Sequence, residues 1–318
     1  MSGQPQGKAS NSSPSDTHAG FVALVGRPNV GKSTLLNAVL GEKLAIVSPR
    51  PQTTRNRILG VRTDAKAQMV LLDTPGIHRT RANMNRFMVQ EALDALDGVD
   101  CVVLITEVSS KARRGRAELN SEDEYVLEQV RQLHGEIPLI VVLNKIDLLR
   151  DRRWLLPLIE AWSSRGFSRI VPMSAQAGDG VDRFVDEVQK MLPAGPHLYP
   201  EEMFTDRAER FLVAEFIREQ VFLQCHEEVP FATAVEVERF EERPEKGDVM
   251  IEAAIHVERE GQKAIIIGAK GSRIKEVGTL AREEISGLIG CTVHLKLVVR
   301  VSRDWTRKPT LRRRFGYE

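Results

Sequence analysis

The residues of this chain that are best suited to chemistry lie together in one short stretch, residues 26–33. The stretch reads Gly-Arg-Pro-Asn-Val-Gly-Lys-Ser, which matches the phosphate-binding pattern of a glycine, four free positions and then Gly-Lys-Ser. Glycines let the backbone approach a phosphate closely, the lysine adds a positive charge, and the serine hydroxyl can ligate Mg²⁺. The predicted polyphosphate site consists of Gly26, Arg27, Pro28, Asn29, Val30, Gly31, Lys32, Ser33 and Thr34.

An acidic residue follows a second apolar run, residues 69–72. An aspartate at the end of a strand beside a phosphate loop can hold a Mg²⁺-bound water, and the N–H of a nearby glycine can reach a terminal phosphate. The sequence Asp-Thr-Pro-Gly after this run supplies both groups. The segment predicted to contact the γ-phosphate consists of Asp73, Thr74, Pro75, Gly76 and Ile77.

Between these two stretches lies a loop that contains prolines and threonines, residues 48–55. A loop that senses a γ-phosphate needs a threonine whose hydroxyl reaches Mg²⁺ in the triphosphate state and releases it after hydrolysis. Thr53 and Thr54 are the candidates, and Thr54 is preferred; the alternative is a flexible loop without this role. The segment named switch I consists of Gln52, Thr53, Thr54, Arg55 and Asn56. The predicted Mg²⁺ ligands are Ser33, Thr54 and Asp73.

A third motif, Asn-Lys-Ile-Asp, follows the apolar run 139–143. A carboxylate there can accept hydrogen bonds from N1–H and the exocyclic amino group of guanine, whereas adenine offers neither donor on that edge. The lysine can lie along the base, the asparagine can tie this loop to the phosphate loop, and a backbone N–H after the next run could bind guanine O6. In this order the motifs predict GTP rather than ATP. The predicted guanine site consists of Asn144, Lys145, Ile146, Asp147, Ser174 and Ala175.

The residue after Gly76 raises a question about catalysis. Many switch GTPases carry a glutamine there that orients the attacking water, but this chain has Ile77, which cannot hydrogen-bond a water. Either hydrolysis is slow or another group orients the water. Asn29 is one candidate, acting through a bound monovalent cation such as K⁺.

The last part of the chain contains a second glycine-bounded loop, Gly-Ala-Lys-Gly, preceded by three isoleucines. A Gly-x-x-Gly loop between two helices is the element with which KH domains hold a nucleic-acid backbone. From Lys263 onward, thirteen Lys and Arg residues stand against five Asp and Glu, so this part carries a net charge of +8 and the remainder −7. This asymmetry fits a polyanion-binding end; the alternative is a solvated basic tail, above all at residues 312–314. The predicted RNA-binding residues are Gly268, Ala269, Lys270, Gly271, Arg273 and Lys275.

The elements that must position these motifs follow from the hydrophobic pattern. Short apolar runs predict strands at residues 21–25, 69–72, 101–105, 139–143 and 170–172. Helical periodicity recurs at residues 85–96, 121–133, 154–164 and 181–192. This alternation predicts an α/β P-loop domain with a mostly parallel sheet and helices on both faces. Beyond it, a helix at 206–225, strands at 231–240 and 249–258, a helix at 276–289 and a strand at 292–302 predict a separate α+β domain.

Length and composition agree with two domains, because 318 residues exceed one typical domain and the 42% hydrophobic and 28% charged content is ordinary for a globular protein. Three prolines within residues 192–200 mark the boundary. Three widely spaced cysteines favour a reducing cytosol, and no apolar run is long enough to span a bilayer. The predicted division is a disordered extension 1–19, a nucleotide domain 20–193, a linker 194–205, an RNA-binding domain 206–303 and a basic tail 304–318.

With these motifs assembled, the chain resembles the Era family of bacterial GTPases from about residue 20 to its end. The phosphate loop, Gln-Thr-Thr-Arg, Asp-Thr-Pro-Gly, Asn-Lys-Ile-Asp and Ser-Ala occur in the family's order, followed by Phe-Thr-Asp-Arg at residues 204–207 and Phe-Gly-Tyr at 315–317. The resemblance implies a Ras-like GTPase domain joined to a type II KH domain. Family members lack the catalytic glutamine, in agreement with Ile77.

The resemblance also implies partners. It predicts GTP and GDP with Mg²⁺, binding near the 3′ end of 16S ribosomal RNA, a role in assembling the small (30S) ribosomal subunit, and peripheral association of a cytoplasmic protein with the inner membrane. We expect a monomer whose nucleotide state gates RNA binding. Two alternatives stay open at this point: a binding module that holds nucleotide as a stable structural ligand, and a membrane-associated switch whose basic C-terminal region binds anionic lipid.

Overall fold

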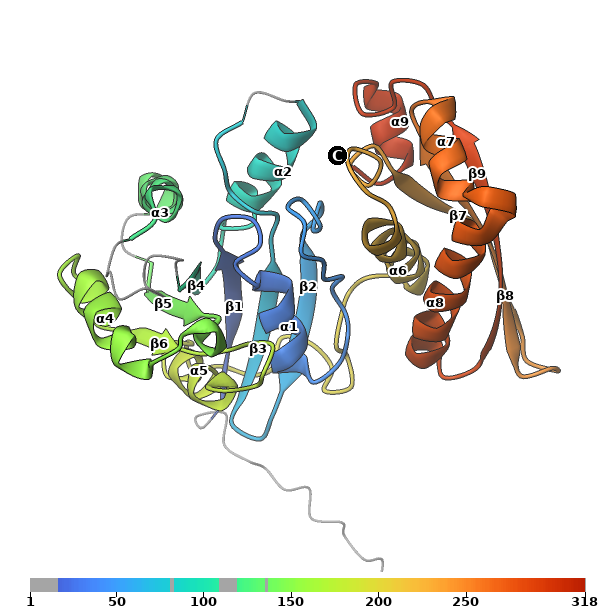
Figure 1. Cartoon of the computed structure of the whole chain (residues 1–318). Helices are drawn as coiled ribbons and strands as arrows, with labels where there is room; N and C mark the ends of the chain where they lie inside the picture. The colour runs from blue at the N-terminus through green and yellow to red at the C-terminus, as the bar shows by residue number, and fades with distance from the viewer. Residues whose placement is uncertain (1–16, 81–82, 109–118, 135–136, 318) are drawn as a thin grey trace, which may run out of the picture.

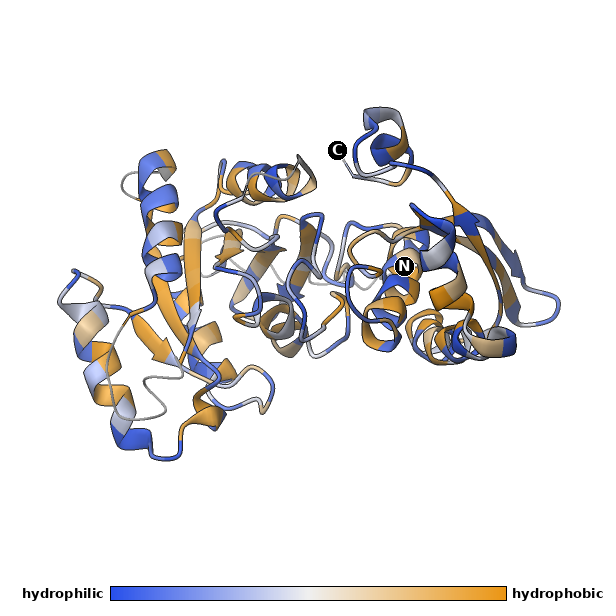
Figure 2. Cartoon of the chain, turned by 45° about the horizontal axis from the view of Figure 1, so that its top comes forward, coloured by the Kyte–Doolittle hydropathy of each residue, from blue (hydrophilic) through white to orange (hydrophobic). Residues whose placement is uncertain are grey.

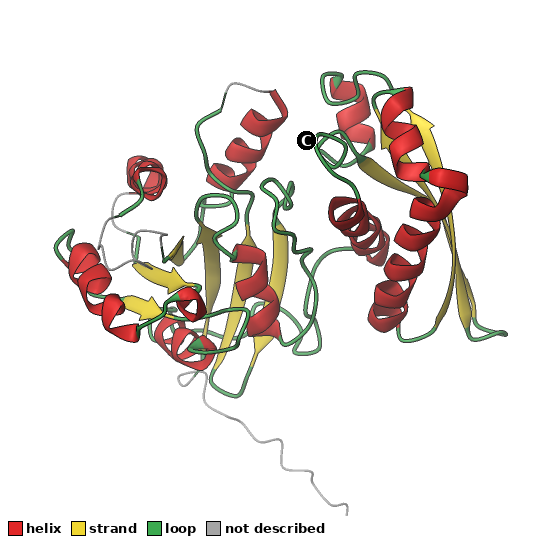
Figure 3. Cartoon of the chain, in the orientation of Figure 1, coloured by secondary structure: helices red, strands yellow, loops and turns green. Residues whose placement is uncertain are grey.

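The computed structural model describes residues 17–80, 83–108, 119–134 and 137–317 and shows two α/β bodies side by side (Figure 1). The N-terminal body contains a six-stranded sheet and the C-terminal body a three-stranded sheet. Figure 3 shows the strands of the larger sheet lying between helices on its two faces. The first sixteen residues of the predicted N-terminal extension lie outside the described residues.

The larger sheet has the strand order β2-β3-β1-β4-β5-β6, and all neighbouring pairs are parallel except β2 with β3. The predicted mostly parallel sheet is therefore confirmed. The antiparallel edge strand β2 was not predicted, because Gly60 and Arg62 interrupt its apolar pattern. The strands are β1 (His18–Val25), β2 (Ile58–Thr63), β3 (Ala67–Asp73), β4 (Cys101–Glu107), β5 (Leu139–Asn144) and β6 (Ile170–Pro172).

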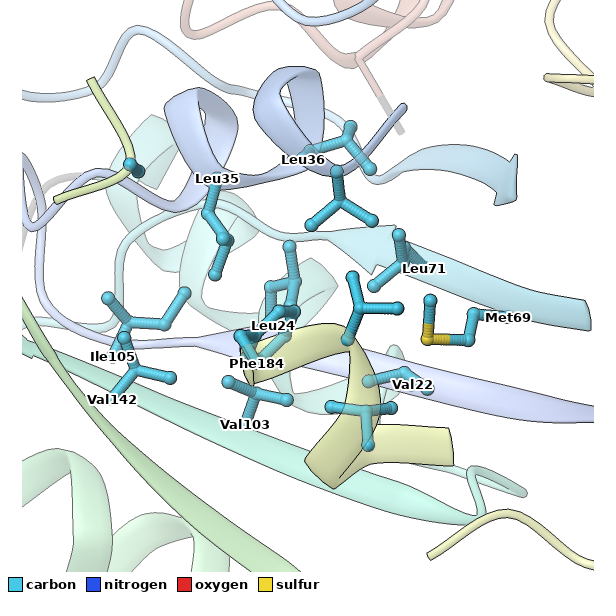
Figure 4. Close-up of a cluster of buried hydrophobic side chains, with 14 of the residues drawn as sticks. Val22, Leu24, Leu35, Leu36, Met69, Leu71, Val103, Ile105, Val142 and Phe184 are labelled. Atoms are coloured by element: carbon cyan, nitrogen blue, oxygen red, sulfur yellow. The ribbon is translucent and has the colours of Figure 1, made fainter. Parts of the chain in front are cut away.

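Both faces of this sheet are apolar and covered. Successive side chains of a strand point to opposite faces, so Val22 and Leu24 pack into one cluster and Ala23 and Val25 into another. Figure 4 shows the first cluster, with Leu24 of β1 among side chains from neighbouring strands and helices. Its covering helices are α1 (Lys32–Leu40) and α5 (Val181–Gln189). The opposite face is covered by α2 (Asn83–Asp94), α3 (Ser121–His134) and α4 (Leu155–Ser163).

This packing explains why the helices read as amphipathic in the sequence. Figure 2 shows that strands of the larger sheet are largely hydrophobic, while the helices carry both hydrophilic and hydrophobic residues, as amphipathic helices do. In the part of this domain that the structure describes, two short 3₁₀ turns follow β5: η2 (Ile146–Leu148), one residue after the strand, and η3 (Arg152–Trp154), directly before α4. The carboxyl ends of the parallel strands meet at one edge of the sheet, where all the predicted nucleotide motifs lie.

The predicted linker is fastened along the edge of the sheet rather than running freely through solvent. The Val61 N–H of edge strand β2 donates to Phe204 O at 2.8 Å, in the manner of an added strand. The buried Gln68 side chain accepts from the Tyr199 N–H at 2.9 Å and donates to Tyr199 O at 2.9 Å. Edge strands expose unpaired backbone groups, so this contact satisfies part of β2 and fixes the path of the chain into the second domain.

The second body follows the order helix, two strands, two helices and strand, which is the order expected for a type II KH domain. Its sheet runs β7-β8-β9, with β7 antiparallel and β9 parallel to β8, and a cluster of buried residues joins it to its helices. The elements are α6 (Glu209–Gln224), β7 (Ala234–Arg243), β8 (Asp248–Val257), α7 (Glu260–Ile267), η4 (Ala269–Gly271), α8 (Ser272–Ile289), β9 (Thr292–Val301) and α9 (Pro309–Arg314).

The two chain ends differ from the expectation. Strand β1 already begins at His18, inside the stretch expected to be disordered, because the Ala19 N–H pairs with Pro193 O. Residues 304–317 do not form a loose basic tail: Trp305, Phe315 and Tyr317 are buried in one cluster with Ala234 of β7. A charge count overlooked these aromatic side chains, whose burial holds the segment against the second domain.

Candidate nucleotide site and nucleic-acid loop

The phosphate loop connects β1 to α1 and folds tightly around its own lysine. Lys32 is 5% exposed, and its Nζ donates to Gly26 O at 3.2 Å and to Arg27 O at 3.1 Å. A Cβ atom at Gly26 would lie 2.3 Å from Ile105 O, so only glycine fits there. Gly31 has φ +100° at the N-terminus of α1, a left-handed conformation that glycine adopts without strain. The loop is thus held in a closed ring around a buried ammonium group.

The three predicted Mg²⁺ ligands come together at the first turn of α1. Ser33 Oγ donates to Asp73 Oδ2 at 2.6 Å and lies 2.8 Å from Thr54 Oγ1, and Thr54 Oγ1 lies 3.4 Å from Asp73 Oδ2. Asp73 is fully buried, and its Oδ1 has no hydrogen-bond partner in the described part of the chain. Clustered oxygen atoms with one orphaned carboxylate oxygen are a donor set that a hard divalent cation would satisfy.

Burial sets the protonation of the two charged groups at this point. Burial lowers the pKa of Lys32 to about 8, although the nearby Asp73 opposes this effect. Burial also raises the pKa of Asp73 to about 6, against the charge of Lys32 and the hydroxyl donors. Each group therefore titrates close to neutrality unless a ligand of opposite charge joins it.

Switch I separates its two threonines clearly. Thr53 Oγ1 lies 2.6 Å from Ser48 Oγ and donates to Arg50 O at 2.9 Å, both within its own loop. Thr54, by contrast, contributes to the cluster with Ser33 and Asp73. The structure thus favours Thr54, which the sequence analysis preferred, as the metal ligand.

A cavity of about 530 Å³ extends from this cluster to the guanine motif. Asn29, Thr54, Gly76 and Asp147 line it. Its size is in the range of pockets that hold small organic ligands. The Asp147 carboxylate is exposed in η2 and has no hydrogen bond or ion pair to any described residue, so it is available to a base.

Asn144 ties three loops together. Its Nδ2 donates to Val30 O at 2.8 Å, and its Oδ1 accepts from the Ala175 N–H at 2.9 Å. The Lys145 Nζ reaches the phosphate loop at Asn29 O, at 2.5 Å. A backbone N–H of Ser174 or Ala175 was expected to bind guanine O6. In the structure the Ala175 N–H is paired with Asn144, and the Ser174 N–H donates to Asp179 O at 2.8 Å. Ser174 shapes the same turn, because its Oγ accepts from the Ala177 N–H at 3.2 Å.

The glycine-bounded loop of the second domain lies between α7 and α8. Gly268, Lys270 and Gly271 have φ values of +71°, +50° and +79°, so the backbone turns through left-handed conformations. The turn is held by the Gly268 N–H, which donates to Ala264 O at 2.9 Å, and the Gly271 N–H, which donates to Gly268 O at 3.2 Å. The Lys270 side chain is exposed. The Arg273 guanidinium folds back to donate to Ile265 O at 2.5 Å, which links the loop to the preceding helix. The shape of the loop would allow the phosphate backbone of a nucleic acid to contact it.

Comparison with known proteins relates both the nucleotide site and the glycine-bounded loop to known families. A family profile described as "50S ribosome-binding GTPase" matches residues 21–145, and one described as "KH domain" matches residues 228–306. The chain is 45% identical over 300 residues to GTPase Era of Syntrophus aciditrophicus (strain SB), covering 94% of this chain and 95% of that protein. It is 46% identical over 301 residues to GTPase Era of Geotalea uraniireducens (strain Rf4), covering 94% and 98%.

The chain belongs to the Era family of GTPases. It is accordingly an enzyme that hydrolyses GTP, built from a P-loop GTPase domain and a C-terminal KH domain. Two solved structures agree at a TM-score of 0.88 each: a variant of Aquifex aeolicus Era bound to GDP.AlF4⁻, 38% identical, and Era in complex with MgGDPNP and nucleotides 1506–1542 of 16S ribosomal RNA, 39% identical. Each alignment covers 95% of this chain and 99% of the other.

Within this Era-family site, the residue at the usual glutamine position is turned away from the cavity. Ile77 is fully buried in the core between the sheet and α2, and its N–H donates to Gly26 O at 3.1 Å. Thr74 is also buried and donates to Leu24 O at 2.8 Å. Gly76 lies against the phosphate loop, since a Cβ there would come within 2.6 Å of Pro28 N. Residues 74–77 therefore position the Gly76 backbone, and the Thr74 and Ile77 side chains do not face the cavity.

One predicted phosphate-loop residue has a different role. The Arg27 guanidinium points away from the cavity and forms ion pairs with Glu107 and Asp123, each at 3.0 Å. Glu107 in turn pairs with Lys145 at 2.5 Å. Neither Glu107 nor Asp123 was among the residues predicted from the sequence. An acidic residue at the end of β4, between the phosphate and guanine motifs, was the signal that could have revealed the first of them.

Proposed function

We propose that this protein is a GTP-hydrolysing switch that binds 16S ribosomal RNA near its 3′ end, acts in assembly of the small (30S) ribosomal subunit, and changes its RNA affinity with nucleotide state. The observation that carries the proposal is the joint geometry of a gathered Ser33–Thr54–Asp73 cluster and an exposed Gly268–Gly271 loop in one chain. The Era structure with MgGDPNP and a 16S fragment supports both ligands at once, since it matches 95% of this chain.

Mg²⁺ is the proposed cofactor, and the donor set fits it. Ser33, Thr54 and Asp73 would hold the ion, which when bound would neutralise the charge that develops on the phosphates. The chain's own residues do the rest. Lys32 places its ammonium at the phosphate loop, the Gly76 N–H is positioned for the γ-phosphate, and Asp147 selects the guanine base.

The group that orients the attacking water is proposed to be Asn29, together with K⁺. Asn29 is exposed at the cavity, with φ +65°, and its Nδ2 donates to Pro49 O at 3.0 Å. This contact leaves the amide Oδ1 for a cation and brings the carbonyl of Pro49, which precedes switch I, beside it. Oxygen ligands of this kind suit a hard monovalent ion. Turnover of Asn29→Ala should lose its preference for potassium over sodium buffer. Equal turnover of variant and wild type in both buffers would remove this part of the proposal.

Localisation and oligomeric state stay predictions: a cytoplasmic monomer with peripheral contact to the membrane. Among the described residues, no helix has the length and apolar character that crossing a bilayer requires. The basic residues of α9 are partly engaged within the protein, since Arg314 forms two contacts of 3.0 Å with Glu236. This pairing reduces the positive charge that α9 offers to anionic lipid, whereas Lys270 of the glycine-bounded loop stays exposed and available to RNA.

The function is tested by crosslinking the protein to an RNA with the 3′-end sequence of 16S ribosomal RNA. The experiment is run with GDP, with a non-hydrolysable GTP analogue, and with competing vesicles of anionic phospholipid. The proposal expects crosslinks at residues 268–275 whose yield differs between the two nucleotides and resists the vesicles. Equal yield in both nucleotide states would remove gating, and displacement by vesicles would favour the membrane-associated alternative.

A further inference from the structure

A cation from the GTPase domain is buried inside the KH domain. Arg55 of switch I is 2% exposed. Its guanidinium donates to Thr233 O at 2.7 Å and to Pro230 O and Phe231 O at 3.0 Å each. These carbonyls belong to the turn that precedes β7. A buried guanidinium is costly unless hydrogen bonds compensate for its lost hydration, so three carbonyl acceptors indicate a site built for this group.

Aromatic rings enclose the same guanidinium. Its central carbon lies 5.8 Å from the Phe222 ring, 5.9 Å from Trp305 and 5.3 Å from Tyr317. These rings come from α6 and from the segment 304–317. Cation–π contacts of this kind gain strength when water is excluded. The site therefore uses both ends of the second domain to hold one residue of switch I.

The residues on either side of Thr54 are held in the same way. Thr53 O accepts from the buried Arg218 guanidinium of α6 at 2.6 Å, and Asn56 Nδ2 donates to Gly316 O at 2.8 Å. Residues 53, 55 and 56 are thus each bonded to the second domain. Consecutive Cα atoms are about 3.8 Å apart, so Thr54 cannot move far while its neighbours are held.

We infer that Arg55 is a positioning residue for GTP hydrolysis: its contacts with the KH domain place the Thr54 hydroxyl beside Ser33 and Asp73. The second domain thereby completes the metal side of the nucleotide site without touching the nucleotide. The inference rests on the proposed assignment of Thr54 as a Mg²⁺ ligand. Because Thr54 acts only in the triphosphate state, Arg55 should matter for turnover and little for holding GDP.

The test compares full-length Arg55→Ala with wild type in single-turnover hydrolysis at saturating GTP and in GDP titrations. We expect the hydrolysis rate to fall about 10- to 100-fold, the scale of a misplacement of about 1 Å. GDP affinity should change by no more than about twofold. Arg55→Lys should recover part of the rate, since an ammonium in the same site can bond some of the three carbonyls. A folded Arg55→Ala enzyme with an unchanged rate, or with GTP and GDP affinities reduced in parallel, would overturn the inference.

Two controls separate positioning from general loosening of the domains. Lys43→Ala removes another contact between the domains, the Nζ pairs with Glu219 at 2.5 Å and Glu284 at 2.7 Å, but touches nothing in residues 53–56. Its hydrolysis rate should stay at the wild-type value, and a fall equal to that of Arg55→Ala would argue against a specific role. Should Arg55→Ala fail to fold, Tyr317→Ala removes one enclosing ring near the end of the chain and should give a smaller loss of rate; an unchanged rate would count against the inference.

Thr54→Ala distinguishes the two levels of the proposal. If it slows hydrolysis and Arg55→Ala does not, the metal-ligand assignment stands and the positioning role fails. If Thr54→Ala hydrolyses GTP at the wild-type rate, the ligand assignment itself fails and the inference fails with it.

Discussion

The protein has two loops that each combine two glycines with a lysine, yet they are built for different tasks. The loop around Lys32 is enclosed: a Cβ at Gly31 would lie 2.3 Å from Asn144 Nδ2, and the lysine itself is buried. The loop around Lys270 is open on its Gly271 side: a Cβ at Gly271 would meet nothing within 4 Å, whereas one at Gly268 would lie 2.8 Å from Arg273 Cβ. The lysine is exposed.

The difference teaches how enclosure converts the same chemistry into different functions. In the enclosed loop, every donor has one position and charges interact strongly, which suits discrimination and catalysis on a single small ligand. In the open loop, exposed and screened charges suit a long polyanion that must be bound and released. A substitution in the loop around Lys32 should therefore reduce ligand affinity far more than a substitution in the loop around Lys270.

The largest effect is expected for Lys32→Ala. Removing the buried ammonium leaves bound phosphate charge unpaired in a site with little water, which should cost about 2–5 kcal/mol of GTP and GDP binding. Isothermal titration with each nucleotide measures this loss. RNA binding by the nucleotide-free protein should be unaffected. Retention of nanomolar GTP binding would contradict the proposed role of the enclosed loop.

A smaller effect is expected for the double variant Gly268→Asp with Gly271→Asp. Two negative charges on the open loop should repel a phosphate backbone and weaken RNA binding by about 10- to 100-fold, with GTP hydrolysis intact. Gly287→Asp, on an exposed position of α8, is the matched control for added charge and should change RNA affinity little. Equal RNA affinity of the double variant and wild type would argue against the KH loop as the binding element.

The pH dependence of nucleotide binding should reflect the burial of the two charged groups at the loop around Lys32. The pKa of Asp73 is raised to about 6, and metal ligation needs its carboxylate, so Mg²⁺-nucleotide affinity should fall about tenfold per pH unit below that value. The pKa of Lys32 is lowered to about 8, and phosphate binding needs its ammonium, so affinity should fall again at higher pH.

In the unliganded protein, the raised pKa of Asp73 affects folding stability, and this effect has the opposite pH dependence to its effect on nucleotide affinity. Its raised pKa means that the folded state binds the proton more tightly than the unfolded chain, so this contribution to stability is lost as pH rises through about 6. Titrations of Mg²⁺–GDP between about pH 5 and about pH 9 check the predicted fall in nucleotide affinity at both ends of this range. An affinity that is flat from about pH 5 to about pH 9 would show that the two groups are not coupled to the ligand.

The smallest effect is expected for Gly271→Ala. The position has φ +79° and open space, so alanine meets no clash but pays about 1–2 kcal/mol for a left-handed conformation. RNA affinity should fall by at most about tenfold. Gly287→Ala, in an ordinary helical turn of the same helix, should instead stabilise the domain by about 0.4–1 kcal/mol in thermal unfolding. A larger loss of RNA affinity in Gly287→Ala than in Gly271→Ala would reverse this interpretation.

How much of this site could be predicted depends on whether the relevant chemistry is local. Lys32, Asp73 and Asp147 each follow a short apolar run, so strand order and motif spacing were enough to bring them to one edge of the sheet. The sequence already preferred Thr54 over Thr53, but the contacts that separate the two threonines, and the burial of Ile77, required coordinates. The α/β fold and the KH order of elements were predicted for the same reason.

What could not be predicted depends on contacts between segments far apart in the chain. Arg27 belongs to the phosphate motif but pairs with Asp123, which is 96 positions away in sequence. The sequence does not distinguish Arg55 from the other arginines as a residue that contacts the second domain. Its contacts with the turn at residues 230–233 are visible only in the structure. The many basic residues of 304–317 predicted an exposed tail, although the segment also contains three aromatic side chains that are buried in the structure. Neither periodicity nor motif spacing reports which distant surfaces meet.

The chain segment fastened along β2 has a consequence for anyone who wishes to produce the GTPase domain by itself. Cutting at the proline-rich stretch near residue 193 would discard Phe204 and Thr205, which bond Val61 N–H and Leu59 O, and would leave a bare strand edge in solution. Such edges recruit other chains and promote aggregation. A truncation that ends after residue 207 would keep the edge covered, and only then would its catalytic rate be a fair measure of what the missing domain contributes.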